Sequence, residues 1–117
     1  MEFLGLLSTG KGTWGQIVGL IEKGDWEKIV IVGPSYAEKF SMPDKKITFI
    51  KIDFDQPLKE LIAEFKEKLS GKFDGLEVSL SLASGSGREH MALISALIQI
   101  PLGIKFVALT KDGIVSF

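Results

Sequence analysis

The sequence predicts one α/β domain spanning residues 1–117, a three-layer sandwich in which helices cover both faces of a mainly parallel sheet of five or six strands. Short apolar runs alternate with helix-like patterns along the whole chain, and such alternation is typical of parallel sheets. One run, KIVIVG at 28–33, is apolar throughout, as expected of a strand that is covered on both faces. An Asp-Gly pair between the last two apolar runs predicts a C-terminal β-hairpin.

The first half of the chain is expected to hold three strands and one clear helix. Apolar residues at helical spacing, among them Trp14, Ile17 and Ile21, predict that helix between two glycine-containing breaks. In chain order we expect a strand at 3–7, a helix at 13–23, a strand at 28–33, a short turn or helix at 34–40 and a strand at 47–53.

The second half holds the clearest amphipathic helix, which is expected to begin at Pro57. Leu58, Leu61 and Phe65 belong to an apolar stripe, and lysines and glutamates occupy the opposite face. In chain order we expect a helix at 57–69, a strand at 76–83, a helix at 88–100 and the two hairpin strands at 104–110 and 113–117.

Composition and charge exclude several classes of partner. The net charge is −1, with acids and bases mixed along the chain, whereas a surface for duplex DNA needs clustered basic residues. No apolar stretch reaches the length of a membrane span, and the N-terminal run is too short for a signal peptide. The chain lacks cysteine and asparagine and is rich in Lys, Glu and Ile, which indicates a thermophile. We therefore expect a cytoplasmic protein that contacts neither membranes nor duplex DNA.

Two loops rich in Gly, Ser and Thr follow the first and the fourth predicted strands. Sheets of this kind bind ligands beyond the carboxyl ends of the strands, where the strand order reverses, so both loops line one crevice if these two strands are neighbours. Backbone N–H groups at helix starts, hydroxyls and cations suit a phosphate or a nucleotide. The expected ligand-binding residues are Ser8, Thr9, Gly10 and Lys11 in the first loop and Ser84, Gly85, Ser86, Gly87 and Arg88 in the second.

An alternative explains the second loop without any ligand. Ser86 and Glu89 have the spacing of a capping box, and turns from a strand into a helix favour small polar residues in any case. The placement of both loops at one crevice favours anion binding over this alternative.

Motifs for catalysis or metal binding are weaker. Residues 5–11 match the start of a phosphate-binding P-loop, with Asp53 in the place of its magnesium-binding carboxylate, but Gly12 stands where that motif needs Ser or Thr. His90 is the only histidine and lies beside the second loop, so it is a candidate general base, and Lys11 is a further candidate catalytic residue. With one histidine and no cysteine, no spacing indicates a metal site, and no cofactor is expected.

The predicted helix at 88–100 is apolar on nearly all sides, and beyond its first turn only Ser95 and Gln99 are polar. A helix on the face of a small sheet normally shows a polar stripe to water. Either neighbouring helices bury this one, or it lies in a subunit interface. We favour the interface and expect an isologous homodimer through helix 88–100.

The Ser/Thr/Gly loop after the first strand, the SGSGR loop at 84–88, the hydrophobic helix after it and the closing hairpin resemble the CRISPR-associated Rossmann fold (CARF) domains. The resemblance covers the whole chain in element order and only the two loops in residues. It implies a Rossmann-like homodimer that binds cyclic oligoadenylates at the dimer cleft and regulates an effector. It places Ser8, Thr9 and Gly10 in the first ligand loop and Ser84 to Arg88 in the second.

The chain also departs from that family. The second loop of the family often has Gly-Gly-Thr-Lys, and no effector domain is expected after Phe117. A sensor that acts in trans or a ring-opening nuclease would fit such a chain, and the sequence equally resembles Rossmann-like proteins of archaea.

The leading hypothesis is a homodimeric binding or sensor domain for a nucleotide or another phosphate-bearing ligand. An alternative is a small metal-independent phosphodiesterase of the ring-nuclease type, which would use Lys11, Arg88 and His90. A third hypothesis is a structural or interaction module whose glycine loops are only turns.

Overall fold

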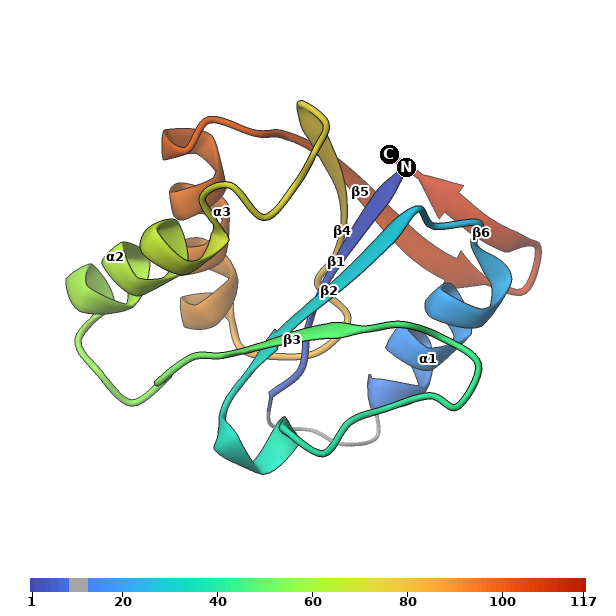
Figure 1. Cartoon of the computed structure of the whole chain (residues 1–117), viewed down its shortest axis with the longest axis horizontal. Coiled ribbons are helices and arrows are strands. Elements are labelled where there is room, and N and C mark those ends of the chain that lie inside the picture. The colour runs from blue at the N-terminus through green and yellow to red at the C-terminus, as the bar shows by residue number, and fades with distance from the viewer. Residues whose placement is uncertain (9–12) are drawn as a thin grey trace.

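The computed structural model describes residues 1–8 and 13–117, which form a six-stranded, mostly parallel sheet and three α-helices (Figure 1). The strands are β1 (Glu2–Leu6), β2 (Lys28–Gly33), β3 (Thr48–Lys51), β4 (Glu77–Ser81), β5 (Gly103–Thr110) and β6 (Gly113–Ser116). The helices are α1 (Trp14–Lys23), α2 (Leu58–Leu69) and α3 (Gly87–Gln99), and a short 3₁₀ helix, η2, covers Ser35–Ala37. None of these described helices is long and apolar enough to cross a membrane. The predicted α/β class, the mainly parallel sheet and the C-terminal hairpin are confirmed.

The strand order is β3-β2-β1-β4-β5-β6. β1 pairs in parallel with β2 and with β4, so that Leu4 lies opposite Val30 on one side and Leu80 on the other. β5 and β6 are antiparallel. The chain adds β2 and β3 on one side of β1 and then returns to add β4 on the other side. The first and fourth strands are therefore neighbours, which is the arrangement that the two-loop crevice requires.

Helices cover both faces of the sheet. Alternate residues of a strand point to opposite faces, and the apolar residues of the central strands therefore need helices on each side. Phe3 and Ile31 pack with α1, whereas Leu4 and Val30 pack with α2 and α3. Figure 1 shows α1 on one side of the sheet and the α2–α3 pair on the other. These four side chains are almost completely buried, and burial of each contributes about 1.5–3 kcal/mol to the free energy of unfolding.

The connection from β2 to β3 contains only the single turn of η2. Ala37 of this turn is buried against the α1 side of the core. Tyr36 points away from the core, and its side chain is 51% exposed. η2 is too short to cover the carboxyl edge of the sheet. Tyr36 therefore lies exposed at that edge.

α3 is covered by its neighbours over most of its apolar surface. α2 packs along it, and the sheet lies beneath it. Its buried residues are Glu89, Ala92, Leu93, Ala96 and Leu97. Met91 and Ile98, which are 55% and 63% exposed, stay on the outer side. α3 therefore leaves less apolar surface for a second subunit to cover than the sequence predicted. The homodimer stays a prediction.

Candidate functional site

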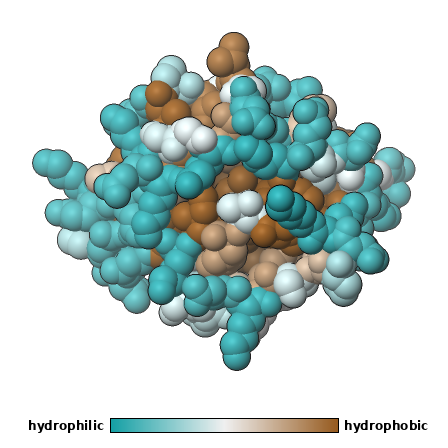
Figure 2. Space-filling model, in the orientation of Figure 1, coloured by the Kyte–Doolittle hydropathy of each residue, from teal (hydrophilic) through white to brown (hydrophobic). Residues whose placement is uncertain are grey.

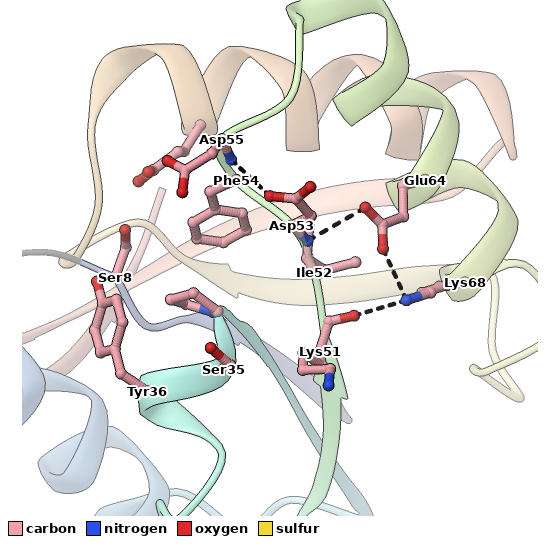
Figure 3. Close-up of a pocket in the computed structure, with 12 residues that line it drawn as sticks. Ser8, Ser35, Tyr36, Lys51, Ile52, Asp53, Phe54, Asp55, Glu64 and Lys68 are labelled. Carbon is pink, nitrogen blue, oxygen red and sulfur yellow. Dashed lines mark hydrogen bonds and ion pairs between the residues drawn. The ribbon is translucent and has the colours of Figure 1, made fainter.

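A cavity of about 450 Å³ lies at the carboxyl edge of the sheet. Its walls come from residues that follow β1, β2 and β3, together with α2 and the first turn of α3. Figure 3 shows Ser8 and Tyr36 on one side of the cavity and the segment from Lys51 to Asp55 on the other. Ligand sites gather at this edge in parallel sheets, because all the strands end there and their loops carry the variable side chains.

The wall that follows β3 is held against α2 by side-chain hydrogen bonds. Lys68 Nζ donates to the carbonyl of Lys51 at 2.8 Å, and the N–H of Asp53 donates to Glu64 Oε1 at 3.2 Å. Gln56 Nε2 donates to the carbonyl of Asp53 at 2.8 Å and also to Glu64 Oε1. These bonds to backbone groups keep the chain after β3 in one position relative to α2.

Glu64 is the electrostatic centre of this network. Its partial burial raises its pKa, because burial penalises the charged form. Hydrogen bonds from Lys68, from the Asp53 N–H and from Gln56, together with the positive charge of Lys68, outweigh burial and hold the pKa of Glu64 below its ordinary value of 4.5. Lys68 Nζ lies 2.7 Å from Glu64 Oε2. The two residues therefore form a neutral pair at the edge of the cavity.

On the opposite wall, Ser8 connects the carboxyl ends of β1 and β4. Its N–H donates to Ser84 Oγ at 3.1 Å, and its carbonyl accepts from Trp14 Nε1 at 3.0 Å. Ser8 and Ser84 are both buried. These contacts bridge the crevice between the two central strands, so the open cavity lies on the side of β2 and β3.

The loop after β4 is a tight turn that needs glycine. Gly85 has a φ of +103°, and a Cβ there would lie 2.5 Å from Leu6 Cδ2 and 2.9 Å from Glu89 Oε1. His90 Nε2 donates to the carbonyl of Ser84 at 2.8 Å. The histidine ring thus anchors the loop to the first turn of α3.

The start of α3 has the predicted capping box. Ser86 Oγ accepts from the N–H of Glu89 at 3.3 Å, and Glu89 Oε1 accepts from the N–H of Ser86 at 2.8 Å. Arg88 reaches across to the segment after β3, where Nη1 donates to the carbonyl of Phe54 at 3.0 Å and Nη2 donates to the carbonyl of Gln56. The second predicted loop is therefore joined to the wall of the cavity through Arg88.

The structure brings only part of the predicted ligand set to the cavity. Ser8 lines it, and the segment from Ser84 to Arg88 lies beside it and bonds to its walls. The contacts described above give Ser84, Gly85 and Ser86 structural roles, as the alternative without a ligand expects. Thr9, Gly10 and Lys11 lie outside the described residues, so their part in binding stays a prediction.

Most of the residues that line the cavity, above all Tyr36 and Asp55, are not among the ligand-binding residues predicted from the sequence. A signal was present for the aspartates, because Asp53 and Asp55 follow the third predicted strand and so belong to the same edge as the two loops. Tyr36 lies in the single turn of η2, and no pattern in the sequence marks it.

No cluster of three or more His, Cys, Asp or Glu side chains able to hold a metal ion occurs among the described residues. Comparison of the chain with models of known protein families and with curated proteins gives no match. Only the geometry and charges of the cavity therefore indicate which ligands would fit it.

Gly85→Ala tests the tight turn after β4. The new methyl group would enter the space of Leu6 and force a left-handed backbone on alanine, so we expect a loss of about 1–3 kcal/mol in the free energy of unfolding, measured in urea. Gly87→Ala is the matched control, because a Cβ at that position would have no atom within 4 Å, and its stability should change by no more than about 0.5 kcal/mol. Equal losses in both variants would contradict this account of the loop.

Glu64→Gln tests the network on α2 through pH. The pKa of Glu64 is lowered by folding, so its charge stabilises the native state above the ordinary pKa of 4.5, and this contribution is lost as the pH falls through the lower folded value. We expect the wild type to be more stable than Glu64→Gln at pH 7, and the difference to shrink below pH 4.5. Glu67→Gln, at an exposed position of the same helix, should follow the wild type throughout. A difference for Glu64→Gln that is independent of pH would show that its charge is unimportant.

Proposed function

We propose that the protein is a Rossmann-like binding domain for a nucleotide or another phosphate-bearing ligand, of the CARF type, and that it acts as a homodimer. The observation that carries this proposal is the cavity at the carboxyl edge, next to the point between β1 and β4 where the strand order reverses. That is where open α/β sheets bind their ligands. The strand order and the closing β5–β6 hairpin support the Rossmann-like assignment.

The first turn of α3 supports a role for phosphate. The N–H groups of Gly87 and Arg88 have no acceptor in the part of the chain that the structure describes, and they lie at the positive end of the helix dipole. A guanidinium carries five N–H donors, and Arg88 uses two side-chain bonds to reach Phe54 and Gln56. Donors therefore remain for an anion that approaches the start of α3.

The interaction module without a ligand is a second candidate, favoured by the structural roles of Ser84, Gly85 and Ser86. Binding of a small ligand separates it from the leading proposal. The ring-nuclease alternative would need a base. His90 would supply it through Nδ1, because its Nε2 donates to the carbonyl of Ser84. Hydrolysis of a cyclic oligoadenylate by the protein would support that alternative.

Calorimetric titration with AMP, pyrophosphate and cyclic tetraadenylate tests the proposed binding. Arg88→Ala should weaken the ligand that binds by about tenfold or more, because hydrogen bonds to charged groups contribute about 1.5–3 kcal/mol. It should also lower the melting temperature, since two bonds to the cavity wall are lost. Lys59→Ala, which removes an exposed charge from α2, is the control and should do neither. Absence of binding by all three probes would refute the proposed function.

The homodimer is tested at the outer side of α3. Met91 and Ile98 are seven positions apart, so they share one face of the helix, and both are exposed. Light scattering should show a wild-type dimer and a folded Ile98→Glu monomer. Leu76→Glu alters an even more exposed apolar side chain outside α3, directly before β4, and should stay dimeric. A monomeric wild type would rule out the dimer. Substitutions at Ala96 or Leu97 would test the core instead, because both are buried.

A further inference from the structure

The charges that the cavity offers to a ligand are mainly negative. Glu64 and Lys68 neutralise each other, and Glu89 accepts the N–H of Ser86 in the capping box. Asp53 and Asp55 line the cavity without an ion pair to any described residue, and the Asp55 carboxylate accepts no hydrogen bond from the described chain.

Lys51 is the one lining cation of the described chain that lacks an ion pair. The two carboxylates of Asp53 and Asp55 outnumber the single ammonium of Lys51, so the cavity repels a phosphate. The same carboxylates can accept hydrogen bonds from hydroxyl and amino groups of a ligand.

Aromatic and apolar residues form part of the rest of the cavity wall, beside Ser8 and Ser35. Tyr36 presents a ring that is 51% exposed, and Figure 3 shows the ring of Phe54 on the opposite side of the space. Pro34, which is partly exposed, adds apolar surface. On the face of the molecule seen in Figure 2, hydrophobic surface lies in the middle and is surrounded by hydrophilic side chains. The aromatic base of a ligand can stack on an exposed ring such as that of Tyr36. Stacking does not depend on which hydrogen-bonding groups the base carries.

We propose that this cavity binds the uncharged nucleoside part of a nucleotide, with the base against Tyr36 and with hydroxyl or amino groups donating to Asp53 and Asp55. The inference rests on the proposed function and makes it more specific, because it assigns the phosphates to the start of α3, outside the cavity. The cavity volume of about 450 Å³ lies in the range of about 300–1,000 Å³ that is usual for small-ligand sites.

Calorimetric titration of the full chain with the four common ribonucleosides, with the matching nucleoside monophosphates and with pyrophosphate tests this assignment. We expect at least one nucleoside to bind without any phosphate, and its monophosphate to bind more tightly. Tyr36→Ala should weaken both by about tenfold, whereas Tyr36→Phe should keep the affinity, because stacking needs the ring and not the hydroxyl.

Asp55→Asn should weaken the nucleoside by about tenfold, because it removes the charge that strengthens the accepted hydrogen bonds and keeps the shape of the side chain. Asp112→Asn, in the turn between β5 and β6, is the control with the same change of charge and should have no effect. Arg88→Ala should weaken the monophosphate more than the nucleoside, because it removes a donor to the phosphate as well as two hydrogen bonds that hold the cavity wall.

The outcomes distinguish this inference from the proposed function. If pyrophosphate or a monophosphate binds and no nucleoside does, the inference is wrong and the proposed function stands. Nucleoside binding that is insensitive to both Tyr36→Ala and Asp55→Asn would also overturn the inference, because the base would then lie elsewhere. If none of these probes binds, and cyclic tetraadenylate does not bind either, both proposals fail together.

Discussion

β1 is hydrogen-bonded to β2 along one edge and to β4 along the other, and its side chains are buried on both faces of the sheet. The rest of the fold is arranged around this strand, because each of its edges and faces has to be covered by a different part of the chain. The strand order reverses beside β1 as a result. That reversal brings Ser8 and Ser84 into contact although they are 76 positions apart in the sequence.

Side chains that bond to backbone groups hold the loops at both ends of β1. At the amino end, the buried Glu2 accepts from the N–H groups of Asp74 and Gly75 at 3.0 and 3.1 Å, which fixes the approach to β4. At the carboxyl end, Ser84 accepts from the N–H of Ser8. Buried polar groups of loops need such partners, since an unpaired one costs about 1–3 kcal/mol. No buried side-chain N or O atom of the described residues lacks a partner.

The residues that suit an anion site are also the residues that this turn needs. Gly85 permits the left-handed backbone, Ser86 caps α3, and Arg88 ties the turn to the wall of the cavity. Their presence in the sequence is therefore weak support for a ligand. Stronger support comes from the cavity itself, since the first N–H groups of any helix lack an acceptor within the helix. Stability and ligand affinity have to be measured separately at these positions, because one substitution can change both.

The sequence alone determined the features that depend on near neighbours along the chain. Short apolar runs identified the strands, helical spacing identified the α-helices, and the spacing of Ser86 and Glu89 identified the capping box. The tertiary structure decided which loops meet, where the cavity opens, what Arg88 binds and how much of α3 is covered by α2. Those outcomes depend on contacts between segments that are tens of residues apart. A periodic pattern shows which face of an element is apolar, but it does not show which other element covers that face, so Tyr36 and Asp55 became visible as a site only after β1, β2 and β3 were placed side by side.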